Sequence, residues 1–249
     1  MSPRMLSPQE FEKREAELIS ISRELFEREC PSTFTIDKLV DASPYSKGTV
    51  YKHFEGKEDV MMAVCNACFR DLRELFEKAL TFKGRSREKL LSVLVSYIIW
   101  AKLRPYQLFI VLSAHSPNVT ANTSEKYQQQ HHECEEQMMT LMCGEIAKAV
   151  EQGDLVLSEN MTLEQVTFAL WSATWGSMAL IISKGTSSQL QAMELERETF
   201  TNGRLIFDGL NWKPLSSEMN YKETLNRIVK ELFSEEVAEL EKMGTPFSY

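Results

Sequence analysis

The sequence lacks the patterns that define several large classes of protein. No segment alternates apolar and polar residues in the way that is typical of a half-buried β-strand, and no internal repeat or low-complexity tract occurs. The five cysteines are an odd number without disulfide-like spacing, and the N-terminal segment MSPRMLSPQEFEKRE contains no apolar signal region. We therefore expect an all-α protein in a reduced, cytoplasmic compartment.

Motifs that carry chemistry are also scarce. The sequence contains no recognisable nucleophile–base pair, no phosphate-binding loop and no clustered carboxylate dyad in a suitable context. We therefore expect no catalytic residues and no cofactor.

Two apolar stretches, residues 90–114 and 166–182, could be mistaken for membrane spans. Lys102, Arg104 and Pro105 interrupt the first stretch. The second falls short of the roughly 20 apolar residues that a spanning helix needs, and it contains several hydroxyl residues. We expect no contact with a membrane.

Charge is unevenly distributed along the chain. The whole sequence carries 28 Lys and Arg against 36 Asp and Glu, a net charge of −8. Nine of the basic and ten of the acidic residues lie in residues 1–57, so nearly all of the excess negative charge belongs to the remainder. Residues 46–57 contain three lysines and a single acidic residue, Glu55. Because salt screens charges beyond about 10 Å, this local basic surface can still attract an anionic partner.

The stretch SKGTVYKHFEGK, residues 46–57, is the most informative part of the sequence. Val50 and Phe54 are four residues apart, so in a helix they share one face, and Gly48 and Lys52 fall on the opposite face. A glycine inside a helix costs about 1 kcal/mol relative to alanine. A helix that lies against the backbone of another molecule gains from the missing side chain. This pattern indicates a recognition helix, with Ser46 as its N-cap.

Residues 35–59, TIDKLVDASPYSKGTVYKHFEGKED, resemble the helix-turn-helix of the TetR-like one-component transcriptional regulators. The family pattern has a threonine, an apolar pair, then Ser-x-Gly-Thr-apolar-Tyr-x-x-Phe and Lys-Glu. The matching residues are Thr35, Leu39, Val40, Ser46, Gly48, Thr49, Val50, Tyr51, Phe54, Lys57 and Glu58. The usual Ala-Gly of the turn is replaced by Ser43-Pro44, and proline cannot adopt a positive φ.

This resemblance implies a three-helix DNA-binding domain over residues 1–56 and a larger helical ligand-binding and dimerisation domain over residues 57–249. It implies a homodimeric regulator, which we expect to be a repressor, on a near-palindromic double-stranded DNA operator. Lys47 is expected to reach base edges, Lys52 bases or phosphates, and most of the others phosphates. The expected DNA-binding residues are Thr35, Ser46, Lys47, Gly48, Thr49, Tyr51, Lys52, His53 and Lys57.

Caps, breakers and apolar spacing predict the remaining helices. The first opens with a capping box at Ser7 and ends before Pro31, and the second begins after Thr35. The later helices are expected at residues 57–80, 86–103, 105–114, 125–152, 162–183, 188–210 and 216–243, with a polar loop at 116–124 and a stop at Gly185.

Aromatic and sulfur-containing residues of the second domain are candidates for a cavity that takes a small apolar or aromatic ligand. For each one alone, an ordinary core position is the competing interpretation. The candidates are Cys68, Tyr97, Trp100, Phe109, Met138, Met142, Trp171 and Trp175. Small residues recur in the helix at 162–183, where the family forms a four-helix bundle between subunits. The dimer candidates are Ala169, Ala173, Gly176 and Ser177.

Two groups have metal-ligand spacing, and we expect neither to bind a metal. Cys65 and Cys68 lie on the predicted helix 57–80 and are interpreted as small buried apolar groups. The second group lies on a polar, glutamine-rich turn and is interpreted as a solvated face. It comprises His131, His132, Cys134 and Glu135.

Two alternatives to a regulator stay open from the sequence. One is a helical enzyme, for which turnover abolished by a pocket mutation, without specific DNA binding, would be the sign. The other is a helical protein-interaction module with a decayed DNA-binding domain, which would bind a partner but show no salt-dependent affinity for DNA.

Overall fold

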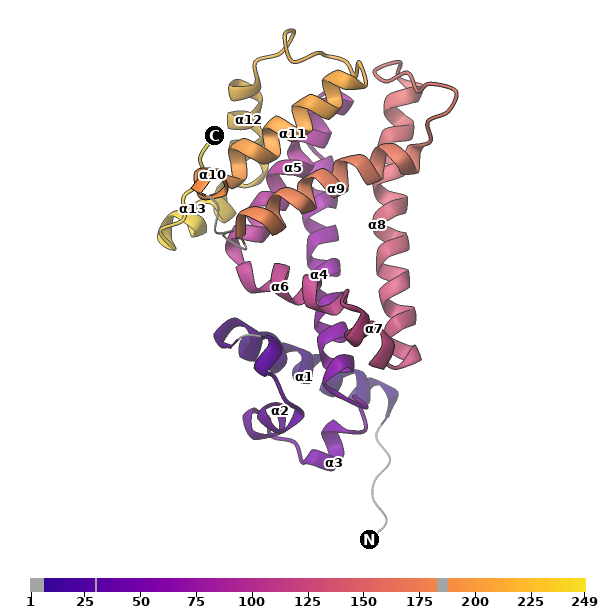
Figure 1. Cartoon of the computed structure of the whole chain (residues 1–249), viewed down its shortest axis with the longest axis vertical. Helices are drawn as coiled ribbons and strands as arrows, with labels where there is room; N and C mark the ends of the chain where they lie inside the picture. Colours follow the sequence, from indigo (N-terminus) through magenta and orange to yellow (C-terminus); the bar gives the residue numbers. More distant parts are fainter. Residues whose placement is uncertain (1–6, 30, 183–187) are drawn as a thin grey trace. The chain divides into compact units, whose positions relative to one another are not determined.

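The computed structural model describes residues 7–29, 31–182 and 188–249, and these residues form helices without any strand (Figure 1). The all-α prediction is therefore confirmed for the described chain. The described residues divide into two compact units, one within residues 1–70 and 106–134 and the other within residues 71–105 and 135–249. The helices α4 and α8 each contribute residues to both units.

The first unit contains the N-terminal helices and a helical segment from the middle of the chain. Its elements are α1 (Pro8–Arg28), a 3-10 turn (Pro31–Thr33), α2 (Ile36–Ala42), α3 (Lys47–Val50), the first part of α4 (Lys57–Leu80), α6 (Pro105–Ala114), α7 (Pro117–Asn122) and the start of α8 (Glu125–Glu151). Pro105 itself is the last residue of a second-unit segment.

Local capping chemistry sets the start of α1, as the sequence predicts. The Ser7 side chain accepts a hydrogen bond from the Glu10 amide at 3.2 Å, and the Glu10 carboxylate accepts one from the Ser7 amide at 2.9 Å. Pro8 occupies the first helical turn, where its missing N–H costs nothing.

The three N-terminal helices enclose a small apolar core. Leu18 of α1, Leu39 of α2 and Val50 of α3 are fully buried together. Phe26 packs on Phe34 with ring centroids 4.6 Å apart. Each fully buried side chain of this size stabilises the fold by about 1.5–3 kcal/mol relative to its exposed state.

The turn between α2 and α3 tolerates Pro44 because it needs no left-handed residue. Within the described chain, positive φ angles occur at Asn211, Gly153 and Gly244, and not in this turn. Tyr45 then fixes the start of α3, because its hydroxyl donates to Glu17 and the Arg14 guanidinium lies 5.0 Å from its ring centroid.

The segment 116–124 is not the polar loop that the sequence analysis expected. Pro117 begins the short helix α7, and the carbonyl of Ser116 accepts the amide of Thr120 at 3.1 Å. Its end is tied to α4, because the Asp59 carboxylate accepts from the amides of Ser124 at 2.7 Å and Glu55 at 2.8 Å. Asp59 is buried, so these hydrogen bonds replace its lost water.

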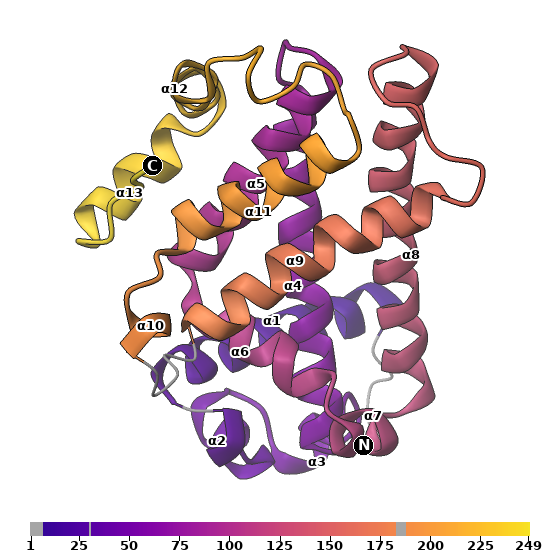
Figure 2. The same ribbon diagram turned by 45° about the horizontal axis from the view of Figure 1, so that its top comes forward.

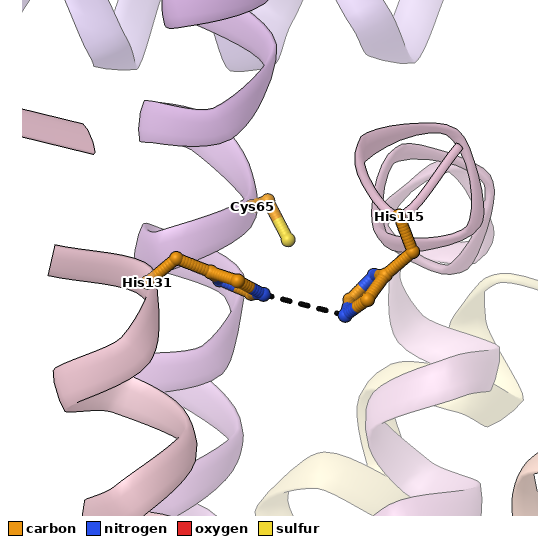
Figure 3. Close-up of side chains that lie close together, drawn as sticks. All are labelled: Cys65, His115 and His131. Atoms are coloured by element: carbon orange, nitrogen blue, oxygen red, sulfur yellow. Dashed lines mark hydrogen bonds between the residues drawn. The ribbon is translucent and has the colours of Figure 1, made fainter. Parts of the chain in front are cut away.

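The first unit also brings Cys65 of α4, His115 after α6 and His131 of α8 together (Figure 3). Cys65 is buried, as expected, but His131 is buried too. The interpretation of its segment as a fully solvated face is therefore wrong for this residue, whereas His132 is exposed. The reason is helical geometry: residues 131 and 132 lie about 100° apart around α8, so they point in different directions.

The second unit is built around α5 (Ser86–Leu103), which is buried along nearly its whole length. Its remaining elements are α9 (Leu163–Ile182), α10 (Ser188–Gln191), α11 (Leu195–Gly209), α12 (Tyr221–Leu232) and α13 (Ser234–Lys242), with the ends of α4 and α8. The helices α9 and α11 run side by side, and α11, α12 and α13 all pack against α5 (Figure 2). At Gly203 an added Cβ would lie 2.5 Å from Leu94, so glycine permits the close approach of α11 to α5.

Two predicted helices are each divided in the structure. The expected helix 188–210 consists of α10 and α11, and the expected helix 216–243 consists of α12 and α13. The second division lies at Phe233, whose non-helical backbone allows its ring to be fully buried. The predicted stop at Gly185 lies outside the described residues. The capping box at Thr162 and Gln165 is confirmed by reciprocal hydrogen bonds of 3.0 and 3.3 Å.

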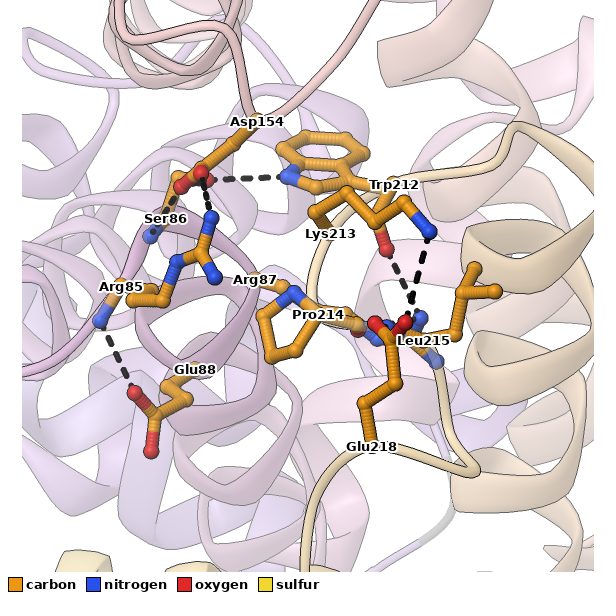
Figure 4. A network of polar contacts seen from close by, with 10 residues as sticks. All are labelled: Arg85, Ser86, Arg87, Glu88, Asp154, Trp212, Lys213, Pro214, Leu215 and Glu218. Atoms are coloured by element: carbon orange, nitrogen blue, oxygen red, sulfur yellow. Dashed lines mark hydrogen bonds and ion pairs between the residues drawn. The ribbon is translucent and has the colours of Figure 1, made fainter.

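A buried arginine joins the start of α5 to the segment after α11 (Figure 4). The Nη1 of Arg87 donates to Asp208 at 2.7 Å and to the carbonyls of Trp212 and Pro214 at 2.9 and 2.8 Å. Although burial opposes it, hydrogen bonds from Ser216 and Arg87 hold the pKa of Asp208 below its usual value. The C-terminal segment beyond α11 is thus an integral part of the second unit.

Candidate DNA-binding surface

The helix α3 is short and fixed at both ends. The Ser46 side chain accepts the Thr49 amide at 3.3 Å, which confirms Ser46 as the N-cap. Beyond Val50 the chain continues in turns. The Val50 carbonyl accepts hydrogen bonds from the backbone amides of His53 at 3.0 Å and Phe54 at 3.1 Å. The recognition segment is therefore a single helical turn with a tightly turned extension.

Gly48 faces outward from the first unit. A Cβ built on Gly48 meets no atom within 4 Å, and the residue is exposed. On the opposite side, Val50 and Phe54 are fully buried. The side-chain vacancy inferred from the sequence therefore opens onto the surface of α3.

Exposed polar side chains surround this vacancy. Thr49 is half-buried, and its hydroxyl lies 2.9 Å from that of Ser46. The exposed members of the predicted set are Thr35, Ser46, Lys47, Tyr51, Lys52 and Lys57. Hydroxyl and ammonium groups of this kind suit phosphate oxygens and base edges.

Lys47 has a carboxylate partner that the sequence analysis did not identify. Its Nζ lies 2.7 Å from Oδ1 of Asp37, and the two side chains are 58% and 68% exposed. The hydrogen bond and charge of Asp37 raise the pKa of Lys47. Because solvent screens such an exposed pair, the attraction is weak, and an incoming anion can displace the carboxylate.

His53 is the one predicted DNA-contact residue that is buried. Its ring stacks on Phe11 with centroids 3.9 Å apart, and Nδ1 lies 3.4 Å from Oε2 of Glu15. Burial lowers the pKa of His53, while Glu15 opposes this shift. We therefore leave the His53 side chain out of the proposed contact surface.

Sequence reasoning also missed the contacts that hold this segment from behind. The Tyr127 hydroxyl donates to the carbonyl of His53 at 3.1 Å, and its ring lies 5.5 Å from that of Phe54. Lys126 Nζ lies 2.5 Å from Glu15. No local sequence pattern predicts these contacts, because they join residues more than seventy positions apart.

Two of the candidate ligand-binding residues pack together in the second unit, beside a third aromatic residue that was not a candidate. Tyr97 and Trp100 are buried with ring centroids 5.9 Å apart, and Phe76 lies 5.5 Å from Tyr97. Burial raises the pKa of Tyr97, and a hydrogen bond from Trp171 opposes this rise. Of the other candidates in this unit, Met142 is buried, and Met138 and Trp175 are half-buried. Cys68 (buried) and Phe109 (exposed) belong to the first unit.

The candidate dimer residues lie on α9, where large apolar side chains are also exposed. An added Cβ at Gly176 meets no atom within 4 Å, and Ala169 and Ala173 are half-buried. Ser177 instead faces α11, accepting from the Asn202 amide at 2.8 Å. Among the described residues, α9 is long and apolar enough to cross a membrane, judged by length and composition alone. Of its most apolar 18 residues, 28% are buried.

Comparisons with known proteins agree with this arrangement. The family model described as bacterial regulatory proteins of the tetR family matches residues 18–64. A protein of unknown function from Rhodococcus sp. RHA1 has a similar fold, with a TM-score of 0.62 and 14% identity over 85% of this chain and 100% of that chain. No curated protein matches the chain.

Two solved regulators also share the fold. A TetR/AcrR-family transcriptional regulator from Thermobifida fusca has a TM-score of 0.56 and 18% identity, over 79% of this chain and 98% of its own. SmeT, the repressor of the multidrug efflux pump SmeDEF of Stenotrophomonas maltophilia, has a TM-score of 0.54 and 15% identity, over 78% and 89%. These likenesses concern the fold. Together with the matched domain, they identify the chain as having the helix-turn-helix domain and the fold of a TetR-family transcriptional regulator.

Proposed function

We propose that the protein is a sequence-specific DNA-binding repressor whose hold on its operator is relieved by a small apolar or aromatic ligand. The single observation that carries the proposal is the outward-facing vacancy at Gly48, ringed by exposed lysines and hydroxyls. A DNA backbone can approach α3 closely there without meeting a side chain. TetR-family proteins are transcriptional regulators, which favours this function over the helical enzyme and the interaction module.

In the proposed complex, two α3 segments of a homodimer enter successive major grooves of a near-palindromic operator, about one helical turn of DNA apart. Lys47 exchanges Asp37 for a base edge, and lysine favours the acceptors of guanine. Thr35, Thr49, Tyr51 and Lys57 then contact phosphates, which fix the register but carry no sequence information.

We propose that α9 and α11 form the dimer interface. Phe168 of α9 is 58% exposed and Leu205 of α11 is 63% exposed. Trp171 and Leu180 of α9 are also exposed. An apolar surface of this kind on adjacent helices supports association with a second copy. It also offers a reason for the apolar composition of α9 other than a membrane.

For the ligand we propose a site that includes the buried pair Tyr97 and Trp100, with Trp171 as a neighbour of Tyr97. The Trp100 indole N–H is buried without a hydrogen-bond partner among the described residues, so an acceptor on a flat apolar ligand would satisfy it. A ligand can shift DNA binding only by its difference in affinity for the bound and free states. The continuous helix α4 supplies residues to both units, so a tilt of α4 would change the spacing of the two α3 segments.

The proposal is tested by selecting bound fragments from the source genome and then measuring affinity against salt. We expect an enriched near-palindrome and an affinity that falls steeply as salt rises. Enrichment of no sequence, or the same affinity for enriched and scrambled duplexes, would contradict a sequence-specific regulator.

A further inference from the structure

Three side chains with metal-binding atoms converge within the first unit (Figure 3). They come from α4 (Cys65), the residue after α6 (His115) and α8 (His131), and the Sγ atom and one ring nitrogen of each histidine lie within 4.8 Å of one another. We propose that this triad binds one Zn²⁺ ion and that the bound ion regulates the DNA-binding segment. The second half of this proposal rests on the proposed function, and the first half does not.

The hydrogen bonds of His131 orient its other ring nitrogen toward the centre of the triad. Asn66 donates through Nδ2 to the carbonyl of Tyr127 at 3.2 Å, which fixes the orientation of its amide. The Oδ1 of Asn66 then faces Nδ1 of His131 at 2.8 Å and can only accept. The proton of a neutral His131 ring is therefore on Nδ1, and Nε2 carries the lone pair that a metal needs.

The same logic applies to His115. Its Nδ1 lies 2.7 Å from the carbonyl oxygen of Val111, which can only accept a hydrogen bond. The Nε2 of His115 is therefore also the lone-pair nitrogen of a neutral ring. Metal-bound histidines commonly donate their second ring N–H to an oxygen in this way, and the oxygen fixes the ring.

The two Nε2 atoms lie 3.3 Å apart. When both rings carry their proton on Nδ1, neither Nε2 has a proton to donate, so a hydrogen bond between the two Nε2 atoms requires an additional proton. A cation, in contrast, binds both Nε2 lone pairs. In a tetrahedral zinc site with Zn–N bonds of about 2.0–2.1 Å, two nitrogen ligands are separated by roughly 3.3 Å. The two imidazoles thus already have the spacing of two zinc ligands.

The third ligand and the surroundings select the metal class. One thiolate and two imidazoles suit zinc or copper, whereas Mg²⁺ and Ca²⁺ prefer oxygen ligands. Phe69 packs its edge against His131 at 5.2 Å and lies 6.2 Å from His115, which supplies an apolar wall. Cys65 and His131 are buried and His115 is exposed, so an ion can enter from the His115 side. Three protein ligands leave a fourth position for water.

A chain of contacts leads from the triad to the end of the recognition segment. His131 is bonded to Asn66, Asn66 to the backbone of Tyr127, and the Tyr127 hydroxyl to the carbonyl of His53. His53 lies in the turn that follows α3. An ion that ties α4 to α8 would thus constrain the residues that support α3, and metal and DNA would alter each other's affinity by the same factor.

The site is tested by metal titration of the full chain in competition with a chromophoric chelator, and by the absorption of the Co²⁺-substituted protein. We expect one equivalent of Zn²⁺ and a thiolate-to-cobalt charge-transfer band. In Cys65→Ser the band should be lost, and both Cys65→Ser and His115→Gln should lose at least tenfold in affinity. His115 is exposed, so its substitution should leave the far-UV circular dichroism unchanged.

His132→Gln is the matched control, because His132 is the exposed neighbour of His131 on the same helix. It should bind zinc as the unmodified chain does. The metal site is overturned by the absence of stoichiometric binding, or by affinity that survives both Cys65→Ser and His115→Gln. Binding confined to Cu⁺ would overturn the assignment to zinc.

Regulation is tested separately, by operator affinity with and without one equivalent of Zn²⁺. We expect a change of about fivefold or more, the lower end of typical allosteric coupling, that disappears in His115→Gln. Unchanged affinity for a bound operator would overturn the regulatory half alone. Zinc binding without any specific DNA binding would contradict the proposed function and leave the metal site supported, so the two failures are distinguishable.

Discussion

The Lys47 ammonium group lies 2.7 Å from the Asp37 carboxylate in the free protein. The side chain that we assign to base recognition therefore already has an anionic partner, on the preceding helix of the same motif. Binding to DNA must replace one anion by another, so Asp37 sets part of the cost of recognition.

Removing this competition should strengthen DNA binding. In Asp37→Asn, Lys47 has no ion pair to give up on binding DNA, so we expect a gain of about two- to fivefold in operator affinity at low salt. Fluorescence anisotropy with a labelled operator measures it. Asp41→Asn is the matched control, with the same loss of charge on the exposed part of α2. Equal gains in both variants would mean that general charge, rather than the pair with Lys47, is responsible.

Base and phosphate contacts should respond differently to substitution. Lys47→Ala should relax the base preference at one operator position, because a base-edge contact discriminates by about 1–3 kcal/mol. Tyr51→Phe, which removes an exposed hydroxyl, should weaken binding to all sequences alike. Selection from a randomised operator library checks both. Unchanged selectivity in Lys47→Ala, or a Tyr51→Phe defect confined to one base position, would refute the corresponding role.

The dimer interface is tested at Gly176. A Cβ added there meets no atom of the described residues within 4 Å, so Gly176→Leu should fold normally while obstructing a second copy packed on α9. Sedimentation should then report a larger monomer fraction than for the unmodified chain. A variant that stays fully dimeric would remove this part of α9 from the interface.

The carboxylate of Asp208 should make stability depend on acid. Folding lowers the pKa of Asp208 below its ordinary value of 3.8. Its contribution to folding stability is therefore present above pH 3.8 and is lost as the pH falls through the lower, folded-state pKa. Asp208→Asn should therefore be less stable than the unmodified chain at neutral pH, with a difference that shrinks below about pH 4. Urea unfolding over a pH series measures it. A difference that stays constant with pH would show that the charge on Asp208 does not matter.

Local chemistry made much of the fold predictable. Side-chain oxygens at Ser7, Thr35 and Ser46 cap their helices as expected, because a cap depends on residues only three positions apart. The helices 57–80 and 86–103 have the predicted bounds. The breaks within 188–210 and 216–243 were missed. The second break lies at the buried Phe233, and neither a glycine nor a proline marks it in the sequence.

The candidate sites were less predictable than the fold. The pattern around Gly48 identified the outward face of α3, but not that His53 turns inward onto Phe11. The cluster of Cys65, His115 and His131 comes from α4, the residue after α6 and α8, so no spacing in the sequence marks it, and His115 was not singled out. Long-range contacts of this kind depend on tertiary packing, which periodicity alone does not specify.

The most direct measurement compares Gly48→Ala with the unmodified chain in two assays. Because the added methyl group meets nothing within 4 Å, unfolding should cost the same or up to about 1 kcal/mol more, as expected for alanine in a helix. Operator affinity should fall at least tenfold, since the methyl group occupies the space that DNA requires. A variant that binds its operator as tightly as the unmodified chain would contradict the account.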